Sequence, residues 1–481
     1  MDKLKKGQNT DGYLTVYVAL TVGILLSLIV TMLCGLRIHT IRFEAECVMD
    51  MAIESVFAEY HREMQKQYGL LFVDSSYGNK EPSEQYTADH LMHYLNLNFD
   101  SNGEAPFYLD LTNIQADNCT LSDVAYATDD YGEVLRYQIN NYIMNSKSMG
   151  FGIFADSDSI ISNLLGYSGL ASRRRSENAR VKSIVDEINA SREENEEPYS
   201  VSNPAESVED ISGSSILYYA LGSNELRSVN VDTKQYISHR QHKNGAGLGP
   251  SKDADGLMDR TFFNEYILKN CGFYGNDLDK SHMNYEVEYI LKGKDSDAKN
   301  LEDVAEDIFK TRYAINMQYL LSSTTKQLEA EELATAAASA VMHPELIAAI
   351  KYSILFAWGY AESAKDLRII YDGHKVGLVK TDAGWNTPLA HMMDFKSHLN
   401  EYNIPGGNIG YREYLYAFLM LASIDNTTMR LMDVMEMDIR DTMGNTNFKM
   451  DGMIYGLEAT VNMSSGYGYG CNIVRKYAYE T

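Results

Sequence analysis

The chain has 481 residues, of which 45% are hydrophobic, and a formal net charge of −25. This negative charge argues against nucleic acids and anionic lipid surfaces as partners, because both would be repelled. The five cysteines are too few for a fold built on disulfides. Their spacing contains no C-x-x-C pair and leaves open either one long-range bridge or free thiols among the four outside the first apolar stretch: Cys47, Cys119, Cys271 and Cys471.

An uncharged apolar stretch from Tyr13 to Leu36 is the first predicted element. A helix of this length would be about 36 Å long, enough to cross a hydrocarbon core of about 30 Å. The stretch is longer than the apolar part of a secretory signal, and no small-x-small cleavage site follows it. Leu33 also replaces the small residue that a lipoprotein leader needs before Cys34. The sequence therefore predicts a retained single-pass membrane anchor.

The charges beside the anchor favour a cytoplasmic amino terminus only slightly. Lys3, Lys5 and Lys6 precede the apolar stretch, and Arg37 and Arg42 follow it. Long domains cross membranes largely regardless of their charge, so the acidic bulk of the chain is compatible with an exterior location. We expect a protein of the cell membrane with a short cytoplasmic amino terminus and a large extracellular domain.

A stalk helix is predicted to continue from the anchor, because neither glycine nor proline occurs between Leu36 and Tyr68. Gly69 would end this helix, and residues 70–74 would form a short buried strand. Apolar residues recur along the stalk at steps of three and four, which predicts one buried stripe. The stripe consists of Ile41, Ala45, Val48, Ala52, Val56 and Tyr60.

The rest of the chain mixes helical and strand patterns. The stretch 344–363 is the most apolar, but Lys351 interrupts it, so we interpret it as a buried core helix and not as a second membrane span. Helices are predicted at 83–99, 133–146, 344–363 and 411–441, strands at 105–128 and 284–291, and a terminal hairpin at 448–480.

These patterns predict an α+β fold in which the stalk helix packs on an antiparallel sheet and a mostly helical second lobe follows. An amphipathic stripe and several half-apolar strands each need a partner face. The expected segments are a tail at 1–12, a transmembrane helix at 13–36, a stalk helix with a first α/β part at 37–167, a charged flexible insertion at 168–212, a strand and loop part at 213–299, a helical lobe at 300–442 and a C-terminal hairpin joining the sheet at 443–481.

Few residues have the type and spacing of a catalytic or metal-binding site. His391, Asp394 and His398 follow one another at steps of three and four, which would place three metal ligands on one helix face. Such residues are also common on solvated faces, so we predict no metal site, no cofactor and no catalytic residue. His239 and His242 lack a second ligand pair nearby and are interpreted as part of a polar loop. Three methionines at helical spacing are interpreted as core residues and not as copper ligands: Met432, Met435 and Met437.

Three stretches resemble a clostridial family of single-pass membrane proteins of unknown function that is found with genes for tight-adherence (Tad) pili. They read ECVMDMAIESVFAEYHREMQKQYGLLFVDSSYG, NYEVEYILKGKDSDAKNL and MDGMIYGLEATV. The opening GYLTVYVAL resembles the start of TadE/TadG-like pseudopilins. The resemblance implies a surface-exposed, non-enzymatic component of a pilus or of the cell envelope, and it supplies no known active site.

In pilins, a glycine precedes the cleavage point and a glutamate stands at the fifth position after it. Carried onto this chain, Gly12 precedes the cut, Tyr13 becomes the first residue and Tyr17 takes the place of the glutamate. The Tyr17 hydroxyl cannot neutralise a new amino terminus inside an apolar bundle, where an unpaired charge costs several kcal/mol. We therefore expect residues 1–12 to be kept.

The leading hypothesis is a membrane-anchored extracellular component of a Tad or type IV-like pilus or of its assembly apparatus, which acts by interaction with pilus or envelope proteins. The alternative is a membrane-tethered extracellular enzyme or a metal-dependent binding module. That alternative would use the face that carries His391 and His398.

Overall fold

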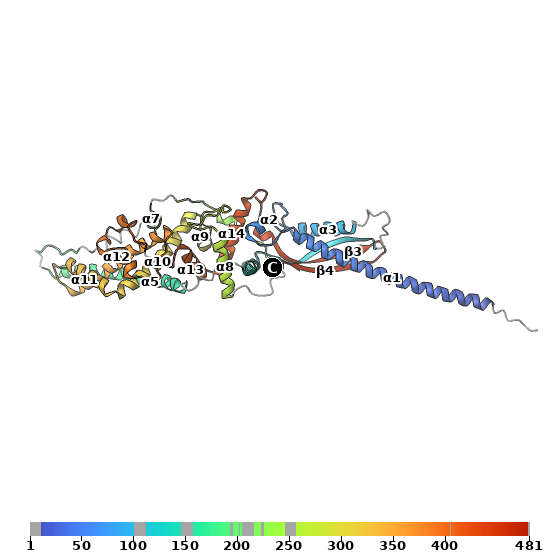
Figure 1. The fold of residues 1–481 in the computed structure, drawn as a ribbon, viewed down its shortest axis with the longest axis horizontal. Helices are drawn as coiled ribbons and strands as arrows, with labels where there is room; N and C mark the ends of the chain where they lie inside the picture. Colours follow the sequence, from blue (N-terminus) through green and yellow to red (C-terminus); the bar gives the residue numbers. More distant parts are fainter. Residues whose placement is uncertain are drawn as a thin grey trace, which may run out of the picture.

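The computed structural model describes residues 11–100, 112–145, 157–192, 196–201, 203, 216–222, 226–245, 256–404 and 406–479. The molecule is long and narrow (Figure 1). One helix projects from one end, a small sheet lies beside the inner part of that helix, and further helices form the other end. The predicted α+β class is confirmed.

The projecting helix is α1 (Asp11–Ala58), which runs without a break through the apolar anchor and into the stalk. Its side chains are mostly exposed up to Thr40, and regular burial begins at Ile41. This confirms the predicted stripe except at Tyr60, which lies beyond the helix end and is 37% exposed. The buried members of the stripe are Ile41, Ala45, Val48, Ala52 and Val56.

The stalk helix ends at Ala58, earlier than predicted. After a short turn, His61 caps a second helix, α2 (Arg62–Tyr68), and its Nδ1 accepts a hydrogen bond from the Met64 backbone N–H at 3.2 Å. Histidine is not among the preferred capping residues, so this break between two helices has no signal in the sequence. Gly69 ends α2 in the left-handed conformation with φ of 72°, as its position predicted.

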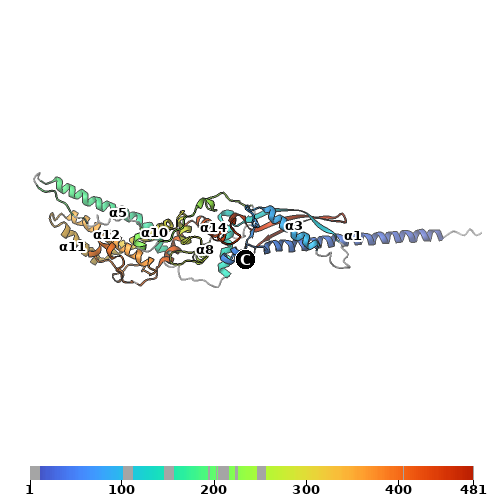
Figure 2. The same ribbon diagram turned by 90° about the horizontal axis from the view of Figure 1, so that it is seen from above.

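The sheet is antiparallel and centred on β3. Strand β2 lies on one side of β3, and β1 and β4 pair with successive parts of β3. The predicted terminal hairpin and its contact with the stalk are confirmed, because β4 packs on α1 and the Phe57 ring contacts the Tyr477 ring with centroids 4.5 Å apart. Figure 2 shows α3 and α1 along this sheet. The elements are α3 (Glu84–Asp100), β1 (Val73–Asp74), β2 (Ile114–Tyr126), β3 (Met453–Ser465) and β4 (Gly470–Ala478).

We call the sheet, α3 and the part of α1 after Leu36 the stalk-sheet part, and α5 with α7 to α14 the helical lobe. In the lobe, α12 is almost fully buried, which confirms its interpretation as a core helix. The helices are α5 (Ser157–Ala190), α7 (Ile216–Leu221), α8 (Leu257–Asn270), α9 (Glu286–Lys292), α10 (Asp297–Ser322), α11 (Thr324–Ala337), α12 (Pro344–Tyr371), α13 (Tyr411–Leu421) and α14 (Ile424–Arg440), while α4 (Glu133–Asn145) packs on α8.

The strand predicted at 284–291 is wrong, because this segment forms helix α9. Its alternating glutamates, Glu286 and Glu288, are both fully buried, whereas a half-exposed strand would turn them to solvent. The Glu286 carboxylate accepts the Gly272 N–H at 2.6 Å, and Glu288 accepts the Tyr411 hydroxyl at 2.6 Å. These hydrogen bonds allow the carboxyl groups to be buried.

The flexible insertion predicted from residue 168 is not observed up to residue 190, where the chain continues as α5. This helix packs on α10, α12 and α13, and it buries Val181 and Ile184. The sequence also predicts that a helix starts at Asn203 and Pro204, but residues 204–215 lie outside the described residues. A narrow buried face is therefore enough to dock α5, a largely polar helix.

The single helix predicted at 411–441 is two helices, α13 and α14. Ser423 separates them and caps α14, its side chain accepting the Asn426 backbone N–H at 3.5 Å. The methionines of α14 are buried in the core as predicted: Met432, Met435 and Met437.

All five cysteines are free thiols. Burial raises the pKa of the Cys271 thiol well above its usual value. Of the two alternatives left open by the spacing, the structure therefore contains free thiols.

Candidate functional site

The candidate site lies on the segment between α12 and α13. Three 3-10 turns shape this segment: Asp382–Gly384, Leu389–His391 and Phe395–His398. Met392 and Phe395 are fully buried and fix the turns against the lobe. The polar side chains that flank these two apolar residues in the sequence lie toward the outer side of the segment.

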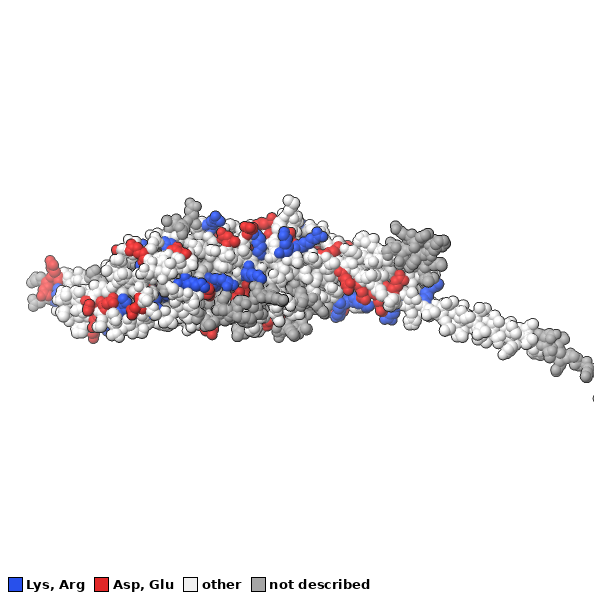
Figure 3. Space-filling model, in the orientation of Figure 1, with Lys and Arg blue, Asp and Glu red and all other residues white. Residues whose placement is uncertain are grey.

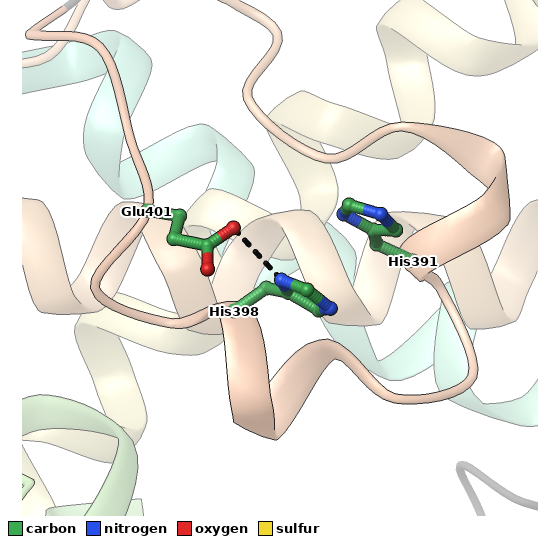
Figure 4. Close-up of side chains that lie close together, drawn as sticks. All are labelled: His391, His398 and Glu401. Atoms are coloured by element: carbon green, nitrogen blue, oxygen red, sulfur yellow. Dashed lines mark hydrogen bonds and ion pairs between the residues drawn. The ribbon is translucent and has the colours of Figure 1, made fainter.

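His391, His398 and Glu401 meet on this outer face (Figure 4). The two imidazole rings are stacked with centroids 3.9 Å apart and an interplanar angle of 10°. Glu401 Oε2 lies 2.8 Å from His398 Nδ1. One ligand atom from each of the three residues lies within 4.8 Å of the other two, and no other such trio occurs in the part of the chain that the structure describes.

The sequence pattern indicates this cluster only in part. The spacing would place His391, Asp394 and His398 on one face if the segment were a helix, but these residues lie in short turns. The two histidines do come together, and Asp394 lies beside His398, with Oδ2 3.2 Å from Nε2. Glu401 was missed, although its position three residues after His398 was a usable signal.

Electrostatics favour the charged form of His398. The hydrogen bond to Glu401 is the main cause of a raised pKa for His398, and Asp394 adds to it. The same hydrogen bond lowers the pKa of Glu401. A metal ion would have to displace a proton from His398, because only the neutral ring nitrogen is a ligand.

The donor set suits a transition metal such as zinc. Two imidazoles and one carboxylate are the ligands of many zinc sites in which a fourth position stays open. Ligand atoms in a tetrahedral zinc site lie about 3.3 Å apart, closer than the limit of 4.8 Å that bounds this trio. The stacked rings would therefore have to turn, which the solvent-facing position of Glu401 and both histidines permits.

A second charged cluster is fully buried inside the helical lobe. Asp366 accepts hydrogen bonds from Arg312 Nη2 at 2.8 Å and from Lys380 Nζ at 2.7 Å, and Lys380 also pairs with Glu362 at 2.5 Å. Burial alone would raise the pKa of Asp366, but the two neighbouring cations hold it below its usual value. The two carboxylates of this cluster neutralise its two cations. We therefore interpret the cluster as an ion-pair network that stabilises the fold.

The other singled-out residues do not form a site. His239 lies with its Nδ1 2.8 Å from the Ser238 hydroxyl, and neither it nor His242 belongs to a trio of metal ligands among the described residues. Gly12, Tyr13 and Tyr17 lie at the exposed start of α1, where Tyr13 is 83% exposed. Their role in processing stays a prediction.

The fold thus includes one helix that is long and apolar enough to cross a membrane, which is consistent with a single-pass membrane protein. Residues 193–465, more than half of the chain, match a family described as "Family of unknown function (DUF5702)". The chain belongs to this family. The matched region runs from the helical lobe to the end of β3 and does not include α1. No curated protein and no solved structure matches the chain.

Proposed function

We propose that this protein is a single-pass membrane protein with a cytoplasmic amino terminus, whose exterior domain acts by interaction as a component of a Tad or type IV-like pilus or of its assembly apparatus. The observation that carries the proposal is the continuity of α1. A single helix leads from an uncharged, exposed apolar stretch directly into the sheet, without a flexible linker. An exterior domain anchored in this way would be held in a fixed direction relative to the membrane.

The charge distribution supports the same placement. In Figure 3, acidic and basic side chains are spread over the body of the molecule, whereas the described part of the projecting helix shows neither. Arg37 lies at the boundary and stacks on the Tyr467 ring, 4.0 Å from its centroid. An arginine and a tyrosine at the end of an apolar helix are typical of the membrane interface. This contact would hold the turn between β3 and β4 close to the membrane.

The proposed pilus association draws on the resemblance of the chain to Tad-associated proteins and on the long, narrow shape of the exterior domain. It is tested by deleting the gene in the native cells and examining surface filaments by electron microscopy. Fewer or shorter filaments would support the proposal. Unchanged filaments would count against it.

Retention of the anchor is tested separately by mass spectrometry of the amino terminus. We expect the intact start in the membrane fraction for the natural chain and for the control Tyr17→Phe. Tyr17→Glu restores the charge that pilins carry, so it is the variant expected to be cut before Tyr13 and to appear in sheared filaments. A natural chain that starts at Tyr13 in sheared filaments would contradict retention.

A second candidate function, a metal-dependent binding module, is favoured by the convergence of His391, His398 and Glu401. Elemental analysis of the purified full chain tests it. Stoichiometric zinc that is lost in His391→Ala and kept in the control His374→Ala would support this second function. Absence of bound metal after incubation with zinc would exclude it.

A further inference from the structure

A small pocket of about 290 Å³ lies where three elements of the helical lobe meet. These elements are the end of α7, the end of α12 and the turn Phe395–His398 with the residues after it. The pocket is distinct from the histidine cluster, because none of the three candidate metal ligands lines it. Its lining contains Tyr218, Gly222, Arg368, Asp372, Lys396 and Asn400.

Arg368 is the most informative residue of this pocket. It is only 5% exposed, and its Nη1 donates to the Ala220 carbonyl at 2.9 Å. Its Nε is buried without a hydrogen-bond partner, and Arg368 forms no ion pair with a described residue. The other fully buried arginine of the lobe, Arg312, pairs with Asp366. A buried guanidinium without a counter-ion is unfavourable unless an anion compensates it.

The pocket wall is fitted closely around this guanidinium. Gly222 has φ of 64°, and a Cβ atom built there would lie 2.0 Å from Arg368 Nη2. A side chain at position 222 would therefore require the Arg368 guanidinium to shift.

A second cation, Lys396, lines the same pocket, with its ammonium 6.0 Å from the Tyr218 ring centroid. One carboxylate, that of Asp372, also lines it and accepts a hydrogen bond from the Tyr402 hydroxyl at 2.6 Å. Among the described residues of the lining, two side chains are cationic and one is acidic. Since the whole chain is strongly acidic, this local excess of positive charge is not a general property of its surface.

We propose that this pocket binds an oxyanion group, phosphate or carboxylate, of an exterior ligand. Arg368 would contact the group from the buried side and Lys396 from the rim. The planar guanidinium matches both kinds of oxyanion. Ligand pockets for whole small molecules begin at about 300 Å³, so a pocket of this size suits one charged terminal group of a larger molecule.

The test uses the full chain in detergent micelles, in buffer passed over a chelating resin so that metal bound at the histidine cluster cannot contribute. Isothermal titration with inorganic phosphate, and separately with acetate, should show saturable binding of at least one of them at constant ionic strength. Saturation with phosphate alone identifies a phosphate group, and saturation with acetate identifies a carboxylate group.

Lys396 lies on the rim of the pocket, so Lys396→Gln should leave the fold intact. This variant should bind the anion about tenfold more weakly, because a hydrogen bond to a charged group is lost. Arg368→Gln should abolish binding. Lys234→Gln, which changes an exposed lysine outside the pocket, is the matched control and should bind like the natural chain. Absence of saturation with both anions, or equal binding by Lys396→Gln and Lys234→Gln, would overturn the proposal.

Discussion

The stalk-sheet part and the helical lobe bury different kinds of side chain. In α1, α3 and the four strands, every described Asp, Glu, Lys and Arg side chain is at least partly exposed, and the side chains buried between the stalk and the sheet are apolar or aromatic. The lobe instead buries acids and bases inside its core: Glu286, Glu288, Asp297, Arg312, Glu362, Lys365, Asp366, Arg368, Lys380, Asp433, Glu436 and Asp438.

The two regions are therefore stabilised in different ways, one by apolar contacts and the other by buried charge pairs as well. Apolar contacts tolerate small shifts, because each contributes in proportion to the area it removes from water. Buried charges stabilise only when every partner is in place, because an unpaired one is strongly unfavourable. We therefore expect the lobe to be sensitive to the loss of single charges and to pH, and the stalk-sheet part to the loss of apolar volume.

The largest expected effect comes from Asp366→Asn in the lobe. This change leaves Arg312 and Lys380 without their shared counter-ion and should lower the free energy of unfolding by about 3–5 kcal/mol. Asp50→Asn is the matched control in the stalk, where the carboxylate lies 2.6 Å from Arg475 but is 54% exposed, so it should cost under about 1 kcal/mol. Urea unfolding of the full chain in detergent measures both. Equal effects would remove the distinction between the two regions.

The next effect concerns apolar packing in the stalk. Phe57→Ala removes a ring that contacts both Tyr477 and Tyr479, and it should cost about 3 kcal/mol through the cavity it leaves. Phe43 lies on the same helix but is 69% exposed, so Phe43→Ala should leave stability nearly unchanged. Equal unfolding midpoints for the two variants would show that α1 does not pack on β4 as described.

A third prediction concerns the pH dependence of the free energy of unfolding. Burial raises the pKa of Glu288 to about 7, above its ordinary value of 4.5. Between these values the unfolded chain has lost the proton while the folded chain keeps it, so stability falls as pH rises. This group alone should lower the free energy of unfolding by about 2 kcal/mol between pH 5 and 7.5.

Glu288→Gln should abolish the loss of stability between pH 5 and 7.5. Glu54→Gln, on the exposed face of α1, should lose as much stability as the natural chain. Urea unfolding at the two pH values measures the difference for each variant. If Glu288→Gln lost as much stability with rising pH as the natural chain, Glu288 would not be a buried neutral acid.

The smallest expected effect is that of zinc on the surface of the lobe. Because the hydrogen bond to Glu401 raises the pKa of His398, a proton competes with the metal, and affinity should fall about tenfold per pH unit once His398 is protonated. Zinc should raise the melting temperature slightly at pH 7.5 and not at pH 5.5. A shift that persists in His398→Ala would place the bound zinc elsewhere.

The same contrast explains what could be predicted from the sequence. In the stalk, the charged residues lie outside the buried stripe, so the period of the apolar residues identified Ile41, Ala45 and Val48 correctly. The terminal hairpin was predicted for the same reason. In α9, two glutamates are inside, so the alternation of charged and apolar residues indicated a strand where the chain is helical.

Other features depended on contacts that one sequence cannot reveal. Helix α5 buries few of its residues, and its polar composition looked like an insertion. The trio of His391, His398 and Glu401 depends on the path of three short turns, which the spacing of the residues does not determine. Arg368 was not singled out, because its lack of a counter-ion becomes visible only when the lobe is folded.

Protease treatment of intact cells tests most directly whether an exterior domain is held on a retained membrane helix. We expect peptides from residues after Ala58 to be released from intact cells, while a fragment containing residues 13–36 stays in the membrane fraction. Protection of the same peptides until the cells are lysed would contradict the proposed topology.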